Sequence, residues 1–447
     1  MTVNGRPTIV FLETGIVTSS SFLQRKTRIT IFHLSNKRMK DYDWVVVGAG
    51  IAGLYTGMLL RLRYPRDRII VLEASSEPGG RASNTLFHGA SVVTGAGIGR
   101  WKKDRRLRRL MNAVGLTPQP FVFQPHRLLP PSVGERLPRT LRQLQRHLHA
   151  SDCHHTFREY GERVLGKEGY RAFVSATGYT DFHHQNACET VRQYGFDDVL
   201  PGWKGFSVPW KELIHRMTRV IGRRHIQYDH RVERISSSKS SKSSNGSKED
   251  HTLELIVATP DGERTILSKQ VVVATTVSTL RHLFPDHAPF RAIQAQPFLR
   301  LYARFDRASR SLMKEKVPAY TVVKGPLQKI IPVNGEKGLY MLSYSDNQDA
   351  KTVYAHRHDR RWLERQTERA LHLPPRSLRI TSVKALYFPE GTHYRRPLSS
   401  SLSSSSSRKT TIPPNVFVVG EAVSRHQGWV EGALETVDDW MRKKMND

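Results

Sequence analysis

Three glycines place the strongest constraint on how this chain folds. Gly48, Gly50 and Gly53 follow the apolar run WVVV with G-x-G-x-x-G spacing, and they lead into a segment of helix formers, IAGLYTGMLLRLR. A second apolar run, RIIVLEA, comes next and contains Glu73, twenty positions after Gly53. Buried strand, tight turn, helix and buried strand in this order predict a parallel β-α-β unit.

Such a unit suits a dinucleotide. Gly48 permits the tight turn, Gly50 lets the backbone approach a pyrophosphate, and Gly53 lets the helix pack closely on the strand. The helix N-terminus offers unpaired N–H groups to the phosphates, and Glu73 accepts hydrogen bonds from the ribose hydroxyls. A glycine-rich turn without a ligand is the alternative, and the strand, helix and acid together favour the dinucleotide.

Four further segments resemble those of the flavin-dependent (FAD) amine oxidase family. EASSEPGGRASNT is similar to the family's G-G-R segment, and TGAGIGR to the segment beneath the flavin ring. HRVERI resembles the strand on the adenine side, and NVFVVGEAVSRHQGWVEGALE the stretch at the ribityl and phosphate region. In the wording of its short sequence segments, such as TGAGIGR, the chain most resembles amine-oxidase-like flavoproteins of large DNA viruses. By this resemblance the FAD-binding residues are Gly48, Gly50, Gly53, Glu73, Gly80, Arg81, Gly95, Ala96, Gly97, Ile98, Val232, Gly420, Glu421 and Val430.

The resemblance implies an α/β fold, with a Rossmann-like FAD-binding domain and an interleaved α+β substrate domain. We expect FAD to be bound noncovalently, because neither cysteine lies in a recognised motif for covalent flavin attachment. The predicted FAD-binding domain comprises residues 39–100, 203–290 and 411–447. The predicted substrate domain comprises residues 101–202 and 291–397.

Three segments are predicted to lack a folded role. Residues 1–38 are basic and rich in Ser and Thr, and we expect a disordered leader, with a transit peptide or an upstream extension left open. The Ser-rich stretches 236–250 and 398–409 lack the apolar residues that offset the entropy of ordering. They are therefore predicted to be flexible surface loops.

The implied reaction removes a hydride equivalent from a carbon that bears nitrogen, in an amine or amino acid. The imine product is hydrolysed by water, and oxygen reoxidises the flavin with release of hydrogen peroxide. Two alternatives stay open, because nucleotide motifs are shared more widely than substrate chemistry. One is a catalytically reduced flavin-binding protein with a structural or nucleic-acid-associated role, and the other is a related FAD-dependent desaturase.

Three residues are catalytic candidates by the same resemblance. Trp429 stands where the family has one aromatic wall of a cage over the flavin, and such a ring face holds a cationic amine. Tyr394 is the candidate for the opposite wall. Arg300 lies nearest to the position of a lysine in many amine oxidases, and its planar guanidinium suits carboxylates. Four roles stay open for Arg300: holding a water, binding an acidic substrate, marking the loss of oxidase chemistry, or merely facing solvent or pairing within its domain.

An excess of basic residues bears on the partners. The chain has 70 Lys and Arg against 40 Asp and Glu, a net charge of +30. This charge repels polyamines at long range and tolerates amino acids or anionic surfaces, within a screening distance of about 8 to 10 Å. A generally basic surface is favoured over dedicated nucleic-acid binding, because no recognition module is visible.

Other patterns narrow the function classes and the compartment. No P-loop, nucleophile elbow or H-E-x-x-H motif is present, and the clustered histidines lack zinc-ligand spacing, so we expect no metal site. The best candidate for a membrane span, residues 45–60, is too short and too rich in glycine. Cys153 and Cys188 are the only cysteines. They predict no disulfide framework and suit a reducing compartment such as the cytoplasm, with a virion or organelle left open.

Overall fold

The computed structural model describes residues 2–3, 6–7, 40–128, 131–237, 252–397 and 412–446. The chain divides into two compact units, Met1–Lys40 and Asp41–Asp447. In the first unit, strands β1 (Thr2–Val3) and β2 (Arg6–Pro7) pair antiparallel. Apart from these four residues the predicted leader lies outside the described residues, as do the two Ser-rich stretches except for Ser236 and Ser237, which end a strand.

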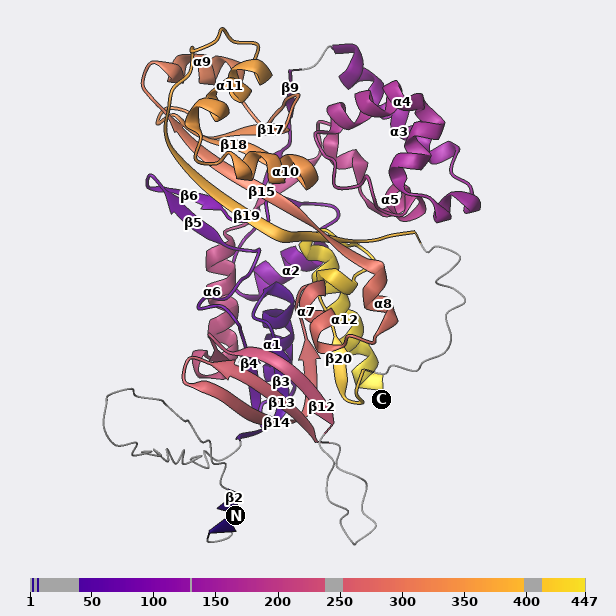
Figure 1. Ribbon diagram of the computed structural model, residues 1–447, viewed down its shortest axis with the longest axis vertical. Coiled ribbons are helices and arrows are strands. Elements are labelled where there is room, and N and C mark those ends of the chain that lie inside the picture. Colours follow the sequence, from indigo (N-terminus) through magenta and orange to yellow (C-terminus); the bar gives the residue numbers. More distant parts are fainter. Residues whose placement is uncertain are drawn as a thin grey trace, which may run out of the picture. The chain divides into compact units, whose positions relative to one another are not determined.

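A seven-stranded sheet contains the predicted β-α-β unit (Figure 1). Its strands are β3 (Lys40–Val47), β4 (Ile69–Leu72), β11 (Ile226–Gln227), β12 (Arg231–Ser237), β13 (Leu253–Thr259), β14 (Gly262–Val273) and β20 (Val416–Val418). The order is β11-β4-β3-β14-β13-β12, and β20 pairs with β14. Strands β3, β4 and β11 are parallel, whereas β12, β13 and β14 form an antiparallel meander. The predicted β-α-β unit is therefore confirmed, and β13 and β14 form a hairpin that turns at Asp261.

Strand β3 explains why its sequence is a continuous apolar run. Trp44 and Val46 face one apolar core, and Val45 and Val47 face another. A parallel strand covered on both faces needs apolar residues at every position. The first of these cores fixes the helix that follows the glycines.

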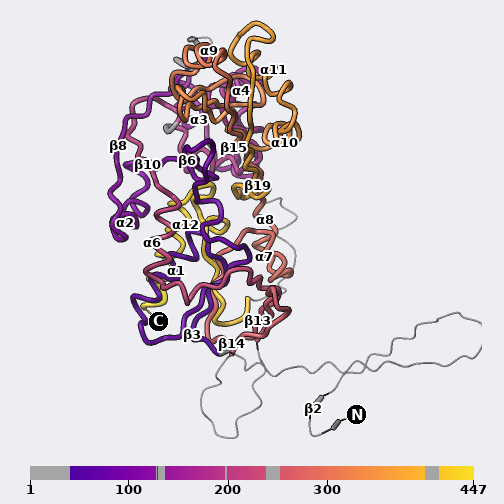
Figure 2. Tube along the Cα trace, turned by 90° about the vertical axis from the view of Figure 1, so that its left-hand side faces the viewer, coloured from indigo at the N-terminus to yellow at the C-terminus, as the bar shows by residue number. Residues whose placement is uncertain are grey.

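Helices cover both faces of this sheet. On one face lie α1 (Ile51–Arg63), α2 (Arg105–Ala113), α6 (Trp210–Ile221) and α12 (Val430–Asn446), and on the other α7 (Val277–Leu283) and α8 (Ala288–Ala292). Helices α1 and α12 pack side by side although they come from opposite ends of the second unit (Figure 2). Helix α2 buries Leu107, Leu110 and Met111, as the spacing of these residues predicts.

A second sheet has six strands in the order β19-β15-β18-β17-β16-β9. These are β9 (His126–Arg127), β15 (Ile293–Phe305), β16 (Thr321–Val322), β17 (Lys329–Asn334), β18 (Leu339–Asp346) and β19 (Ile380–Arg395). Helices α9 (Ser309–Lys316), α10 (Asn347–Ala355) and α11 (Arg360–Ala370) pack on it. Helices α3 (Pro131–Arg146), α4 (Phe157–Thr177) and α5 (Ala187–Gln193) share a separate aromatic core.

Short elements complete the described chain. The remaining strands are β5 (Asn84–Phe87), β6 (Ala90–Val93), β7 (Gly99–Arg100), β8 (Gln119–Val122) and β10 (Lys204–Ser207). The 3-10 helices are η1 (Ala150–His154), η2 (Phe196–Val199), η3 (Arg223–His225) and η5 (Glu421–Val423). None of the described helices has the length and apolar composition that crossing a bilayer requires.

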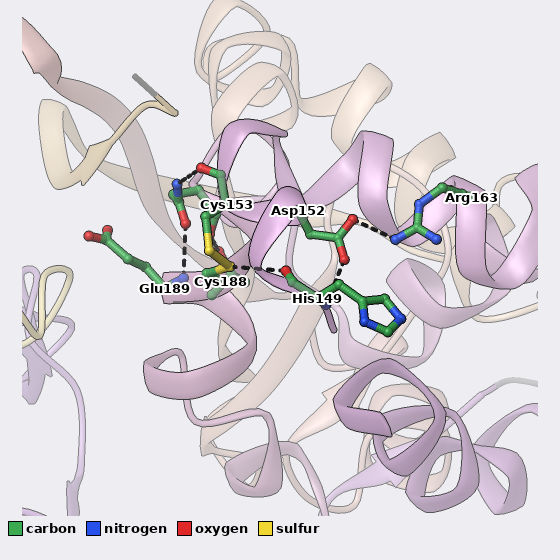
Figure 3. The surroundings of a disulfide bond; sticks show 8 residues. His149, Asp152, Cys153, Arg163, Cys188 and Glu189 are labelled. Atoms are coloured by element: carbon green, nitrogen blue, oxygen red, sulfur yellow. Dashed lines mark hydrogen bonds and ion pairs between the residues drawn. A yellow bond between two sulfur atoms is a disulfide. The ribbon is translucent and has the colours of Figure 1, made fainter. Parts of the chain in front are cut away.

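The expectation that the two cysteines form no disulfide is wrong. Cys153 in η1 and Cys188 in α5 are joined, with their Cα atoms 5.0 Å apart (Figure 3). Around the bond, the Asn186 amide donates to the Cys153 carbonyl oxygen, and the Asp152 carboxylate accepts from the His149 backbone N–H and pairs with the Arg163 guanidinium. Spacing gave no sign of this pairing, which depends on η1 packing against α5. Because disulfides are rare in the cytosol, the cysteines do not support a reducing compartment.

Candidate active site

Two adjoining cavities lie in the second unit. The glycine cavity, about 750 Å³, is lined by Gly48, Gly50, Gly79 and Gly80 among others. The aromatic cavity, about 1160 Å³, is lined by aromatic residues from several elements. Residues that line both cavities form the junction, and these are Tyr179, Asp181, Arg300, Tyr344, Thr392, Gly428 and Trp429.

The glycines of the turn after β3 meet two different physical needs. Gly48 has φ +99°, and a Cβ atom there would lie 2.6 Å from the Ala274 carbonyl oxygen. A Cβ atom on Gly53 would lie 1.8 Å from the Gly48 carbonyl oxygen. Gly50 has an ordinary φ of −68°, and a Cβ atom there would have no neighbour within 4 Å. Packing therefore demands Gly48 and Gly53, whereas a bare Gly50 widens the cavity.

Glu73 is held at the edge of the glycine cavity by the turn itself. Its Oε2 accepts a hydrogen bond from the Ala49 N–H at 2.6 Å. Its Oε1 accepts from the backbone N–H and the hydroxyl of Ser75. A carboxylate has about four acceptor positions, so three partners leave capacity for a further donor in the cavity.

Glu421 also lines the glycine cavity, but protein donors surround its carboxylate. Oε1 accepts from the backbone N–H groups of His393 and Gly428, at 2.9 and 2.6 Å. Oε2 accepts from Arg81 at 3.0 Å and from Nδ1 of His393 at 2.5 Å. Although burial raises the pKa of Glu421, His393, Arg81 and these hydrogen bonds lower it well below its ordinary value. With all four acceptor positions used, Glu421 ties together the segments around the cavity.

Most of the residues predicted to bind the cofactor meet at the glycine cavity. Those that line it are Gly48, Gly50, Glu73, Gly80, Arg81, Gly95, Ala96, Val232, Gly420, Glu421 and Val430. Gly97 and Ile98 line the aromatic cavity instead. Gly53 lines neither and serves the packing of α1.

Arg300 is buried at the junction, with 4% of its surface exposed, so it does not face solvent. It lies in β15 between β18 and β19. Nε donates to the Gly95 carbonyl oxygen at 2.6 Å, and Nη1 lies 3.5 Å from Sδ of Met341. Its guanidinium carbon is 4.0 Å from the centre of the Tyr344 ring.

Trp429 lies at the junction and its predicted partner does not. The Trp429 indole Nε1 is buried and has no hydrogen-bond partner among the described residues. Tyr394, expected as the opposite wall, is buried in β19 and lines neither cavity. Tyr179 and Tyr344 supply aromatic rings at the junction instead. The correction follows from the long pairing of β19 with β15, which buries Tyr394 opposite Gln294.

Buried charged groups surround these two tyrosines. The Lys329 ammonium lies 3.3 Å from the Tyr179 ring centre and 4.3 Å from that of Tyr344. Burial lowers the pKa of Lys329 to about 7, opposed by the charges of Asp346 and Asp181. Burial, followed by the like charge of Asp346, raises the pKa of Asp181 to about 7. At neutral pH, Asp181 is therefore a junction carboxyl group able to gain or lose a proton.

Sequence reasoning missed Tyr179, Asp181, Lys329 and Tyr344 as members of one site. In the sequence, Asp181 stands close to His183 and His184, a cluster without zinc-ligand spacing. Among the described residues, no three metal-ligating side chains are grouped for an ion. No local motif marks the two tyrosines, because Tyr179 follows α4 and Tyr344 lies in β18, and their rings meet only in the folded chain.

Comparisons with known proteins place this geometry in context. NAD(P)-binding Rossmann-like domains match residues 46–114, and flavin containing amine oxidoreductases match residues 154–436, more than half of the chain. A solved triple mutant of putrescine oxidase, made in a redesign of its cofactor binding, superposes with a TM-score of 0.67. The match has 12% identity and covers 91% of this chain and 99% of that chain, so it bears on the fold alone. No curated protein sequence matches the chain. The predicted α/β Rossmann-like fold is confirmed, and the narrower viral resemblance stays a prediction.

Proposed function

The chain belongs to the family of flavin-containing amine oxidoreductases, which are FAD-dependent enzymes, and we propose that it is an oxidase of amines or amino acids that releases hydrogen peroxide. The substrate loses two electrons and a proton pair at its C–N bond, giving an imine that water hydrolyses. Oxygen receives the two electrons together with two protons and becomes hydrogen peroxide. The observation that carries the proposal is the junction, where the same side chains line the glycine cavity and the aromatic cavity.

The residues present fit FAD. Helix α1 begins at the glycine cavity with no acidic residue in its first turn, which favours a diphosphate there. The open space at Gly50 and the spare acceptor capacity of Glu73 suit a phosphate and a ribose hydroxyl. Trp429 also lines this cavity, and its Nε1, which has no partner among the described residues, offers a further donor. Bound FAD supplies the hydride-accepting chemistry, which the side chains do not provide.

We propose noncovalent binding and the domain division that the sequence suggests. The seven-stranded sheet with α1, α6 and α12 forms the FAD-binding domain, and the six-stranded sheet with α3 to α5 forms the substrate domain. The junction then lies where segments of both domains meet. Asp181 and Arg300 come from the substrate domain, and Trp429 comes from the FAD-binding domain.

The junction residues have separate roles in this proposal. Trp429, Tyr179 and Tyr344 hold the amine between aromatic faces, which attract a cationic nitrogen. Asp181 takes a proton from the substrate ammonium at a carboxylate oxygen, because its pKa is raised to about 7. The neutral amine has the lone pair that assists loss of hydride from the adjacent carbon.

Anaerobic reduction of the flavin tests this function. The FAD-loaded protein is mixed with a panel of amines and amino acids, and the visible absorbance of the flavin is followed. We expect at least one substrate to bleach it and, in air, to yield peroxide in proportion to imine. Asp181→Asn should slow bleaching about 100-fold or more and remove a pH dependence near pH 7. Unchanged absorbance with every compound would contradict the proposal, and bleaching without peroxide would contradict the oxidase assignment.

A further inference from the structure

We propose that the substrate carries a carboxylate beside its amine, as an α-amino acid with an apolar side chain does, and that Arg300 binds this carboxylate at the junction. The inference rests on the proposed function and specifies its substrate class. Arg300 is a buried cation with no ion pair among the described residues.

Arg300 has hydrogen-bonding capacity that the described residues leave unused. Its Nε is satisfied by Gly95, but Nη1 meets only the thioether of Met341, a weak acceptor. Within the part of the chain that the structure describes, Nη2 donates no hydrogen bond and no carboxylate oxygen lies within 4.0 Å of the guanidinium. A buried charge is costly unless it is paired, so an anion in the cavity would stabilise this arrangement.

The residues around Arg300 restrict the direction from which an anion can reach its guanidinium. Its Cα is paired with those of Tyr344 in β18 and Leu386 in β19, in the interior of the sheet. The Tyr344 ring lies against the guanidinium, and Nη2 is 3.3 Å from the place where a Cβ atom on Gly97 would stand. A planar guanidinium with one face covered offers its edge, and that edge binds carboxylates through two parallel hydrogen bonds.

Two acidic groups near Arg300 accept hydrogen bonds from other residues, although Oδ2 of Asp346 has no hydrogen-bond partner among the described residues. Asp346 accepts hydrogen bonds from the backbone of Thr180 and the amide of Gln328. Asp181 accepts one from the hydroxyl of Tyr194 and lines the junction together with Arg300. The junction therefore presents one guanidinium and one carboxyl group, the pair that an amino-acid zwitterion requires.

The aromatic cavity indicates what the rest of the substrate is like. Its wall includes Phe121, Phe123, Phe157, Phe196, Trp203 and Tyr320. Arg142 and Arg192 also line it, whereas the acids other than Asp181, which are Glu431 and Glu435, pair with Arg106. Such a wall favours an apolar side chain and an anionic molecule over a polyamine, which is cationic at both ends.

Matched pairs of compounds test the inference. FAD-loaded protein is reduced anaerobically with phenylalanine and phenethylamine, with leucine and isoamylamine, and with putrescine. We expect the amino acid of each pair to be preferred by at least 10-fold in kcat/KM. Arg300→Gln should lower kcat/KM for phenylalanine about 10- to 100-fold and change that for phenethylamine less than 3-fold, because it removes charge-assisted hydrogen bonds to the carboxylate alone. Arg219→Gln on α6, which removes an exposed charge outside both cavities, is the matched control and should change neither.

A binding measurement separates the inference from catalysis. 3-Phenylpropanoate has the carboxylate but no amine, and it should raise the Tm of the FAD-loaded wild type more than 3-phenylpropanamide does. Arg300→Gln should abolish the difference. Three results would overturn the inference while leaving the proposed function intact: preference for the decarboxylated amine, reduction by putrescine alone, or an Arg300→Gln effect equal for both members of a pair. Reduction by no compound in any pair would contradict the proposed function, and equal Tm shifts from the acid and the amide would then contradict the inference as well.

Discussion

Glu73 and Glu421 are both acids at the glycine cavity, yet their hydrogen bonds give them different uses. Glu73 accepts three hydrogen bonds from the turn, which leaves one acceptor position for a donor in the cavity. All four acceptor positions of Glu421 are occupied by donors of Arg81, His393 and Gly428. At the scale of single residues, then, one carboxylate is available to FAD and the other holds the surrounding segments in place.

We expect Glu73→Gln to weaken FAD binding about 10- to 100-fold, the worth of a hydrogen bond to a charged group. FAD titration of apo-protein, followed by quenching of flavin fluorescence, measures this. Glu77→Gln, an exposed neighbour on the same segment, should bind FAD as the wild type does. Equal affinities for Glu73→Gln and the wild type would contradict the assigned role.

Glu421→Gln should lower the free energy of unfolding by about 3 kcal/mol, because Arg81 loses its buried partner. The folded pKa of Glu421 lies below the unfolded value of about 4.5, so its stabilisation is present above pH 4.5 and is lost as the pH falls further. Urea unfolding of the apo-protein at several pH values tests both points. The variant should lose less stability than the wild type below pH 4.5, and parallel pH curves would contradict the argument. Glu315→Gln, at an exposed position, provides the control.

At the scale of elements, local patterns predicted local structure well. The β-α-β unit followed from apolar runs such as Val45–Val47, and the helical spacing of Leu107, Leu110 and Met111 agrees with the buried face of α2. The junction did not follow, because Arg300 and Tyr344 meet only through the pairing of β15 with β18, and Tyr179 reaches them from the segment after α4. Tyr394 was misplaced because the long pairing of β19 with β15 buries it away from both cavities.

The disulfide joins two secondary-structure elements, and the spacing of the cysteines in the sequence did not predict it. Cys153–Cys188 joins η1 to α5, and α5 contributes Val191, Arg192 and Gln193 to the aromatic cavity. The double variant Cys153→Ser/Cys188→Ser should therefore lose about 3 to 4 kcal/mol of stability in a chain-entropy model. It should also raise KM for the substrate more than it lowers kcat. Thermal unfolding and steady-state kinetics measure these, with the dithiothreitol-treated wild type for comparison, and an unchanged Tm would contradict the role.

Net charge acts at the scale of the whole molecule. A chain of net charge +30 attracts anions and repels cations over the screening length of the solution. Raising the salt concentration from 20 to 300 mM shortens the screening length from about 21 Å to about 6 Å. This change should lower kcat/KM for a substrate of net negative charge such as glutamate. The same change should raise kcat/KM for putrescine. Stopped-flow flavin reduction at both concentrations tests the signs, and a neutral zwitterion such as leucine should change least.

The central claim is that FAD lies across the turn at Gly48 and Gly50, and Gly50→Ala tests it most directly. The backbone of Gly50 suits any residue and an added Cβ has no protein neighbour within 4 Å, so apo-protein stability should change by less than about 1 kcal/mol. The account predicts that the wild type binds FAD and that Gly50→Ala binds it at least 10-fold more weakly in the same fluorescence titration. Equal FAD affinity in the two proteins, or no FAD binding by the wild type, would contradict it.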